Sequence, residues 1–324
     1  MQEILITGGG GFLGKNLITY LLQNTDCKIT IVDNFISSNR EEFIKLHTTN
    51  NRVTLYEYDI TDVEKMMCLK SNFHFDEIYH LASLASPKFY KKYSIETLDV
   101  GYTGTKNILE IARSHGSRVL FSSTSEVYGD PICDIQSEIY FGNVNCFGDR
   151  SCYDESKRVA ESLCYTYINQ FGLDIKIARI FNTYGPGMII NDGRIVTEVI
   201  KSLINNSTLT IYGTGEQTRS LCYVANTINM LVKLMASNCN TPVNIGNNEE
   251  YTINEIVDTI TGVYKENFNN TITLKKSYVA LTENDPLKRC PCLKKNNRIL
   301  GLENYVSLQK GMLDTIRYFK ENLK

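Results

Sequence analysis

The chain has 324 residues, 42% of them hydrophobic, and its 34 Lys and Arg side chains nearly balance 36 Asp and Glu side chains. The formal net charge of -2 excludes a generally basic nucleic-acid-binding protein and a polybasic membrane anchor. A chain of this length can bury a substantial core, and at about 150 residues per domain it forms two domains or one large α/β domain.

The ten cysteines are scattered along the chain without a Cys-x-x-Cys pair, and the closest two are Cys290 and Cys292. The four histidines show no metal-ligand spacing, so we predict reduced cysteines and no metal site. A predicted strand follows Met1 almost directly and leaves no room for a signal peptide, and no apolar run approaches the ~18 residues of a membrane span. These features predict a cytoplasmic protein that binds neither membranes nor nucleic acid.

Short β-branched runs alternate with helical patterns in the first half of the chain. The predicted strands are 3–7, 28–33, 53–59, 77–82, 118–124 and 174–181. Apolar residues recur at helical spacing between them, over 12–22 and 96–115. This alternation predicts βαβ units and therefore an α/β fold, a Rossmann-type doubly wound parallel sheet with helices on both faces.

The pattern becomes less regular after about residue 180. The predicted helices there are 192–206, 226–237, 252–266 and 307–321, and the predicted short strands are 208–212, 242–245 and 271–274. We therefore predict a nucleotide-binding domain over 1–180, to which segments near 213–247 return, and a smaller, mainly substrate-binding region over 181–324.

A glycine-rich loop, Thr7-Gly8-Gly9-Gly10-Gly11-Phe12-Leu13-Gly14, joins the first predicted strand to the first helix. Gly8, Gly11 and Gly14 permit a tight turn, close approach of a pyrophosphate and close packing of helix on strand. Asp33 ends the next strand about 20 residues further on, where a carboxylate accepts both ribose hydroxyls and repels a 2′-phosphate. The loop and Asp33 together predict a site for NAD rather than NADP.

Tyr153 and Lys157 are four residues apart on a predicted helix, so their side chains share one face. A nearby ammonium group lowers the pKa of a phenol and makes it a usable base near neutral pH. The same spacing is common on solvated helices, and it gains weight only beside the glycine-rich loop. With that loop, the pair resembles the extended, nucleotide-sugar-modifying branch of the short-chain dehydrogenase/reductase superfamily.

Five further motifs sharpen the resemblance. They are Ser123-Thr124-Ser125-Glu126-Val127-Tyr128-Gly129-Asp130-Pro131, Cys152-Tyr153-Asp154-Glu155, residues 179–186, Asn191-Asp192-Gly193-Arg194 and Gln217-Thr218-Arg219. From about residue 3 to 320 the chain resembles the UDP-glucuronate decarboxylase (UDP-xylose synthase) family. Ser125 is the informative position, because family dehydratases carry Asp-Glu after the Thr and many epimerases lack the Glu.

The resemblance implies a redox-neutral carboxy-lyase: oxidation of the sugar at carbon 4 by NAD, loss of carbon dioxide from a 4-keto intermediate and return of the hydride. The implied catalytic residues are Tyr153, Lys157, Thr124, Glu126, Ser125 and Arg219. The implied cofactor-binding residues are Gly8, Gly11, Phe12, Leu13, Gly14, Asp33, Asn34, Asp59, Ile60, Leu81, Tyr153 and Lys157. The implied substrate-binding residues are Tyr90, Asn182, Arg194, Tyr212, Arg219 and Arg289.

The chain departs from the family pattern at four positions. Gly101 and Gly187 stand where Asn and Arg are usual, and Asn226 and Cys292 stand where Asp is usual. None of these positions belongs to the set of Tyr153, Lys157 and Thr124. The loss of an arginine at Gly187, however, puts the binding of the substrate in doubt. A sugar-nucleotide 4,6-dehydratase, a 4-epimerase, a variant that releases the 4-keto product and a non-catalytic NAD-binding protein stay open as alternatives.

Relatives in this branch commonly form homodimers through a four-helix bundle that includes the helix bearing the catalytic tyrosine. The resemblance therefore implies a homodimer here. Val159, Leu163 and the segment 108–111 supply apolar positions for such a bundle, although packing of the core needs them equally.

Overall fold

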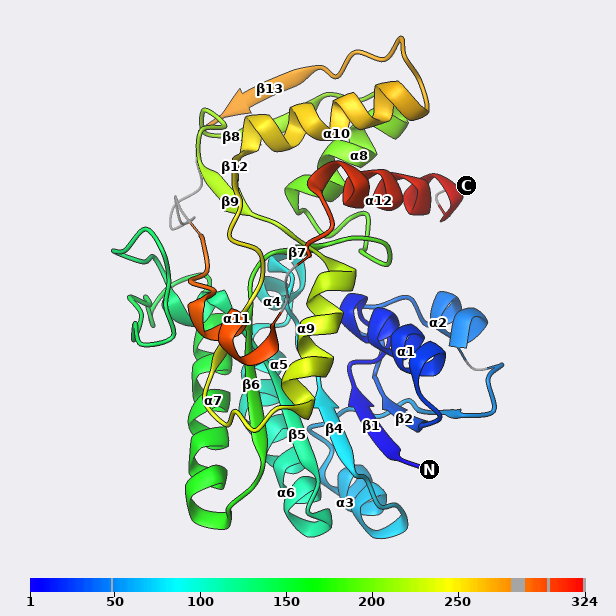
Figure 1. Ribbon diagram of the computed structural model, residues 1–324, viewed down its shortest axis with the longest axis vertical. Helices are drawn as coiled ribbons and strands as arrows, with labels where there is room; N and C mark the ends of the chain where they lie inside the picture. The colour runs from blue at the N-terminus through cyan, green and yellow to red at the C-terminus, as the bar shows by residue number, and fades with distance from the viewer. Residues whose placement is uncertain (48, 281–288, 302–303, 323–324) are drawn as a thin grey trace. The chain divides into compact units, whose positions relative to one another are not determined.

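The computed structural model describes residues 1–47, 49–280, 289–301 and 304–322 (Figure 1). The chain divides into two compact units. Unit 1 comprises Met1–Val127, Val144–Arg179 and Ile228–Val243, and unit 2 comprises Tyr128–Asn143, Ile180–Thr227 and Asn244–Lys324. The predicted domain boundary near residue 180 stays a prediction.

Among the described residues, seven strands form one central sheet in the order β11-β6-β5-β4-β1-β2-β3. Their bounds are β1 Glu3–Thr7, β2 Lys28–Val32, β3 Val53–Tyr56, β4 Glu77–His80, β5 Arg118–Thr124, β6 Ile175–Ile180 and β11 Val243–Ile245. β1 pairs in parallel with both β2 and β4, and β2–β3 and β4–β5 continue the parallel pairing outward. The chain thus starts at the middle of the sheet and winds toward both edges, which confirms the predicted doubly wound fold.

Helices flank this sheet, and α3, α6 and α7 lie side by side in unit 1 (Figure 1). The helices of this part are α1 Phe12–Asn24, α2 Arg40–His47, α3 Val63–Asn72, α4 Pro87–Lys92, α5 Ser94–Asp99, α6 Thr105–His115, α7 Ser151–Phe171 and α9 Val224–Ala236. Ile78 and Val119 of the sheet pack with Leu69, Ile108 and Ala160 of the helices, each at most 1% exposed. Burial of such side chains stabilises the unit by roughly 1.5–3 kcal/mol each for the larger ones.

The helix predicted over 96–115 is not continuous. A π-helical segment, η1 (Val100–Gly104), separates α5 from α6 and packs against α7. A Cβ atom at Gly101 would lie 2.5 Å from the Cβ of Ser156, so only glycine allows α7 to come this close. Leu98 and Tyr102 of this stretch are exposed, whereas the apolar residues of α6 are buried, so the spacing of apolar residues does not reveal where the π-turn interrupts the helix.

The segment 108–111 lies inside unit 1 and not on its surface. Ile108, Leu109 and Ile111 are buried in the core, and Leu163 is partly buried against it. Of the apolar positions that the resemblance offered for a dimer, these pack within the chain itself, whereas Val159 is exposed.

Unit 2 is built on short strands and three packed helices. Its elements are β7 Thr183–Tyr184, α8 Ile195–Asn205, β8 Leu209–Tyr212, β9 Thr218–Ser220, β10 Cys222–Tyr223, β12 Glu250–Thr252, α10 Ile253–Asn267, β13 Lys276–Val279, α11 Lys294–Leu300 and α12 Leu308–Asn322. The 3₁₀ turn η2 (Ser125–Tyr128) belongs to unit 1 except for Tyr128. α10 packs against α8 and α12, and a capping box of Thr252 and Glu255 closes its N-terminus.

One predicted strand is wrong. Residues 271–274 form no strand, and β13 begins two residues later at Lys276, where it pairs in parallel with β8 through Lys276 and Leu209. Alternating Thr and Ile at 271–274 satisfies the local preference, but the partner strand decides where the hydrogen-bonded ladder starts.

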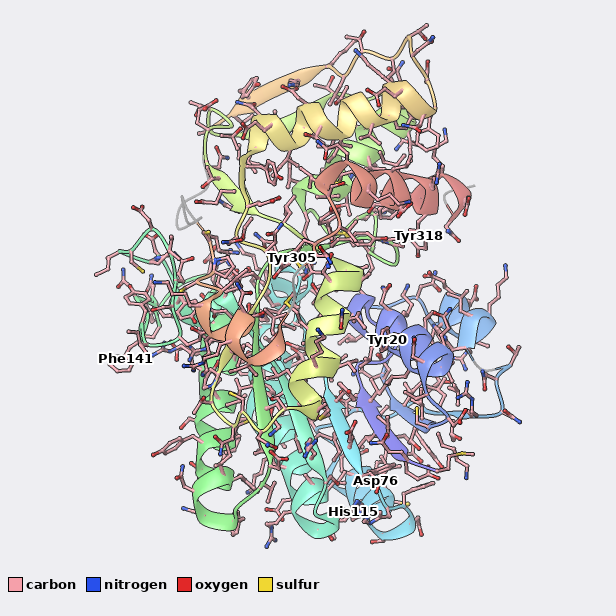
Figure 2. All side chains as sticks on the ribbon, viewed as in Figure 1. Tyr20, Asp76, His115, Phe141, Tyr305 and Tyr318 are labelled. Carbon is pink, nitrogen blue, oxygen red and sulfur yellow. The ribbon has the colours of Figure 1, made fainter. Side chains whose placement is uncertain are left out.

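A long irregular segment joins η2 to α7. Figure 2 shows Phe141 of this segment pointing outward, and its side chain is 91% exposed. Within the described part of the chain, no helix has the length and apolar character needed to cross a membrane. The cytoplasmic location stays a prediction.

Candidate active site

The glycine-rich loop lies between the C-terminal end of β1 and the N-terminus of α1. Gly8 has a positive φ of 72°, and a Cβ atom there would lie 2.6 Å from the backbone nitrogen of Ala82. A Cβ atom at Gly14 would lie 2.4 Å from the Gly8 carbonyl oxygen. A Cβ atom at Gly11, the N-cap of α1, would meet only that same oxygen, at 3.2 Å. The loop is therefore tight against the sheet and open above the helix N-terminus, which is the shape that a pyrophosphate needs.

Asp33 follows β2 and is held beside this loop. One of its carboxylate oxygens accepts a hydrogen bond from the Gly10 N–H at 2.8 Å, and the other accepts one from the Phe35 N–H at 2.8 Å. Burial raises the pKa of Asp33, while these backbone hydrogen bonds act in the opposite direction. The carboxylate thus has a defined place next to the loop, as a ribose-binding acid requires.

The other residues expected at the adenosine end lie in the same part of unit 1. Asn34 donates a hydrogen bond to the Asp59 carboxylate at 2.8 Å, and the Thr61 N–H donates to its other oxygen at 2.8 Å. Ile60 is buried beside them, and the Leu81 N–H donates to the Thr7 carbonyl at 3.0 Å. These residues fit a dinucleotide that starts at the glycine-rich loop.

The second group of candidate residues lies where β5 ends and α7 begins. Thr124 is the last residue of β5, and its hydroxyl accepts a hydrogen bond from the Glu126 N–H at 3.2 Å. Ser125 and Glu126 form the first residues of η2, and both are buried. The side chain of Lys157 donates from α7 to the Ser122 carbonyl on β5 at 2.7 Å. Burial lowers the pKa of Lys157 to about 7.

Tyr153 lies one helical turn before Lys157 and stacks on Tyr90 of α4. The two rings are nearly parallel, at 8°, with centroids 5.1 Å apart. Tyr90 is only 1% exposed, and its hydroxyl has no hydrogen-bond partner among the described residues. A buried hydroxyl without a partner is costly, so its position beside Tyr153 favours a ligand that supplies the missing hydrogen bond.

Three further polar contacts of unit 1 were not predicted from the sequence. Arg150 forms an ion pair with Glu126 at 2.7 Å. Arg179 binds both carboxylate oxygens of Glu161, which also accepts a hydrogen bond from Ser123. The partners in these contacts are 18, 24 and 38 residues apart in the sequence, and no sequence period connects them.

His80, the third of these contacts, ends β4 and is fully buried. Its two ring nitrogens lie 2.7 Å from the Thr7 hydroxyl and 3.1 Å from the Thr105 hydroxyl. Burial lowers the pKa of His80 to about 3, so the ring stays neutral and ties β1 and β4 to α6. Its role is structural.

The candidate substrate residues of unit 2 fall into two sets. Ser220 donates from its N–H and its hydroxyl to the Arg289 carbonyl, at 3.4 and 3.1 Å, so the backbones of Arg219 and Arg289 lie close together. Both arginine side chains are largely buried. The Asn182 carbonyl accepts a hydrogen bond from the Cys222 N–H in the adjoining strand pair.

Arg194 and Tyr212 form the second set. Arg194 precedes α8 and pairs with Asp192 at 3.5 Å, and Tyr212 ends β8 with a half-exposed ring.

Comparison with known proteins identifies the family. The model of the NAD dependent epimerase/dehydratase family matches residues 4–246. UDP-glucuronic acid decarboxylase 3 of Arabidopsis thaliana is 43% identical over 311 residues, which cover 96% of this chain and 87% of that protein. UDP-glucuronic acid decarboxylase 1 of Xenopus tropicalis is 41% identical over 323 residues, 100% of this chain and 73% of that protein. The chain belongs to the UDP-glucuronic acid decarboxylases of this NAD-dependent family.

Solved structures agree with the fold of the NAD-dependent family. UDP-glucuronic acid 4-epimerase from Bacillus cereus, in complex with UDP-glucuronic acid and NAD, superposes with a TM-score of 0.86 at 25% identity, over 99% of this chain and 100% of that one. UDP-glucose 4-epimerase from Thermotoga maritima superposes with a TM-score of 0.89 over 100% of both chains, and at 24% identity it supports the fold alone. NAD is the cofactor of the family to which this decarboxylase belongs.

The structure accounts for three of the four departures from the decarboxylase pattern. Gly187 has a φ of 93°, a conformation that an arginine would adopt only with strain. Gly101 faces Ser156 across the closest contact between η1 and α7. Asn226 uses both ends of its amide, donating to the Asn304 carbonyl and accepting from the Val306 N–H. Nothing in the structure explains Cys292.

Proposed function

We propose that the chain catalyses the NAD-dependent decarboxylation of UDP-glucuronate to UDP-xylose. The observation that carries the proposal is the grouping of Thr124, Glu126, Tyr153 and Lys157 at the end of β5 and the start of α7. The glycine-rich loop, Asp33 and Lys157 would hold NAD, which would supply a hydride acceptor for carbon 4 of the sugar and, as NADH, a hydride donor after decarboxylation.

Tyr153 serves as the base of the first step. Its phenolate takes the proton of the hydroxyl on carbon 4, and Thr124 orients that hydroxyl. Lys157, which is buried and held by the Ser122 carbonyl, stabilises the phenolate by its charge and binds the cofactor ribose. General-base catalysis of this kind contributes roughly 10²–10⁴-fold to the rate.

Decarboxylation then follows from the ketone at carbon 4, which is β to the carboxylate. The bond from carbon 5 to the carboxylate breaks, its electron pair moves into the enolate, and carbon dioxide leaves. Arg219 binds the departing carboxylate and stabilises the enolate, and Glu126 orients the sugar while carbon 5 takes a proton. Ser125 fits this chemistry because no leaving hydroxyl has to be protonated.

The unpartnered hydroxyl of Tyr90 supports a place for the sugar next to Tyr153. Arg289 and Asn182 contact the diphosphate, and Tyr212 and Arg194 contact the uridine end, in the same proposal. A cation such as arginine suits a diphosphate because its donors match two oxygens at once.

Proton NMR of the purified protein with UDP-glucuronate tests the reaction. We expect the anomeric signal of UDP-xylose without added NAD, because the hydride returns to the product and the cofactor is regenerated. A 4-keto product together with stoichiometric NADH would mean that the intermediate is released before the hydride returns to carbon 4. Turnover of UDP-glucose instead of UDP-glucuronate would contradict the proposal.

We further propose that the protein forms a homodimer through α5, η1 and α7. These packed elements expose large apolar side chains, namely Ile95, Leu98, Tyr102, Val159 and Tyr165. Ile95 and Tyr165 are 72% and 68% exposed, and exposed apolar patches on packed elements are typical of protein–protein interfaces. Light scattering after size-exclusion chromatography should give twice the chain mass, and Ile95→Glu with Tyr165→Glu should give the monomer.

A further inference from the structure

Arg150 forms an ion pair with Glu126, the carboxyl group among the candidate catalytic residues. Its guanidinium lies 2.7 Å from the Glu126 carboxylate, and the side chains are only 23% and 11% exposed. Water screens such a pair much less than a surface ion pair, so the interaction strongly favours the ionised carboxylate.

The backbone of Arg150 adds a second constraint. Its carbonyl accepts hydrogen bonds from the N–H groups of Tyr153 at 3.0 Å and Asp154 at 3.1 Å, in the first turn of α7. One residue therefore fixes the start of the helix that carries Tyr153 and the side chain of Glu126 on η2. The ion pair with Glu126 requires the Arg150 side chain, whereas the hydrogen bonds to the Arg150 carbonyl would remain after a substitution of that side chain.

The other ionisable groups around Glu126 in unit 1 do not replace this cation. Asp154 and Tyr153 on α7 and Tyr90 on α4 are acids, and the electrostatic fields of Glu126, Asp154 and Arg150 all reach Tyr90. Burial by itself would lower the pKa of Arg150, but Glu126, Tyr90 and Asp154 raise it further than burial lowers it. On the neighbouring turn of α7, Arg158 donates to the Val127 carbonyl. Removal of the Arg150 guanidinium would take away the ion pair at 2.7 Å and leave the Asp154 carboxyl group on the same helix.

We propose that Arg150 is a positioning residue that keeps Glu126 ionised, so that Glu126 acts on the sugar as a hydrogen-bond and proton acceptor and not as an acid. The inference rests on the proposed function, because it assigns a state to a residue of that same site. It predicts that the charge of residue 150, and not only its volume, sets the pH at which the Glu126 carboxyl group loses its proton and the enzyme becomes active.

The experiment compares wild type, Arg150→Gln and Arg150→Lys by kcat/KM for UDP-glucuronate across pH. In Arg150→Gln we expect the acid limb to move up by roughly one to three pH units, the range by which a close opposite charge shifts a carboxyl group. The activity lost at pH 7 should largely return at high pH. Arg150→Lys keeps the positive charge but not the planar guanidinium with its several donors, so it should shift the acid limb of kcat/KM less than Arg150→Gln does.

Arg113→Gln is the matched control. Arg113 pairs with Glu110 at 2.8 Å on α6, but both side chains are more exposed, at 44% and 31%. Its pH profile should equal that of wild type. A defect in Arg150→Gln that is equal at every pH would reduce Arg150 to a structural residue and overturn the inference.

A titration of glutamate carboxyl ¹³C signals gives a readout that needs no turnover. The Glu126 signal is assigned by its loss in Glu126→Gln, and it should titrate at higher pH in Arg150→Gln than in wild type. Unchanged titration overturns the inference even if UDP-xylose is formed. Absence of UDP-xylose from wild type, with the titration shifted, overturns the proposed reaction and leaves the coupling of Arg150 to Glu126 standing.

Discussion

The two units supply their functional side chains in different ways. In unit 1, Tyr153 and Lys157 come from one long helix, and the glycine-rich loop comes from one strand–helix junction. In unit 2, Arg219 lies on a three-residue strand and Arg289 in an irregular segment, and Ser220 joins their backbones. Chemistry that depends on spacing within one element can be recognised along the chain, whereas substrate contacts depend on segments that meet only after folding.

The largest expected effect concerns the helix of unit 1. Tyr153→Phe removes the base but keeps the ring that stacks on Tyr90, so we expect UDP-xylose formation to fall by roughly 10²–10⁴-fold. Thermal stability and NAD binding should stay near those of wild type. An unchanged rate in the NMR assay would remove Tyr153 from the mechanism.

The arginines of unit 2 should separate into a chemical and a binding role. Arg219→Ala should lower kcat by roughly 10²–10³-fold, as expected for loss of a group that stabilises developing charge. Arg289→Ala should mainly raise KM, by about 10- to 100-fold, because hydrogen bonds to a charged group are worth roughly 1.5–3 kcal/mol. Steady-state kinetics measures both, and identical effects on kcat and KM in the two variants would contradict the separation.

Substitution of one glycine in each unit tests how closely the backbone packs there. Gly101→Ala places a Cβ atom 2.5 Å from Ser156, next to Lys157, and should cost about 1–3 kcal/mol in the free energy of unfolding. Gly262→Ala in α10 meets nothing within 4 Å and should stabilise the helix by up to about 1 kcal/mol. Urea unfolding measures both. Equal stability of the two variants would mean that η1 and α7 are not held as closely as described.

The last prediction concerns the pH dependence of stability. Burial lowers the pKa of Lys157 from 10.5 to about 7, so between these values the unfolded chain holds a proton that the folded chain releases. The free energy of unfolding should therefore rise with pH across that interval, and Lys157→Met should flatten the rise. Urea titrations of NAD-depleted protein at several pH values measure the slope. The same slope in both proteins would show that Lys157 is charged in the folded state.

The fold followed from the sequence wherever local pattern and tertiary packing agree. β1 and β5 have the predicted bounds, α1 begins at Phe12 directly after the loop, and α7 is the helix predicted to carry Tyr153 and Lys157. The predictions failed where a partner decides the outcome. The strand after α10 starts at the register of β8, and the close contact at Gly101 accompanies the π-turn of η1.

The sequence by itself determined the Rossmann fold, the glycine-rich loop between the first strand and helix, and the placement of Tyr153 and Lys157 one turn apart on one helix, because each lies within one or two consecutive elements and has a fixed period or spacing. Only the tertiary structure decided that Arg150 meets Glu126, that Tyr90 stacks on Tyr153 and that Ile108 packs inward. Those contacts join residues from different elements, and their distances depend on how helices pack on the sheet, which no local pattern records.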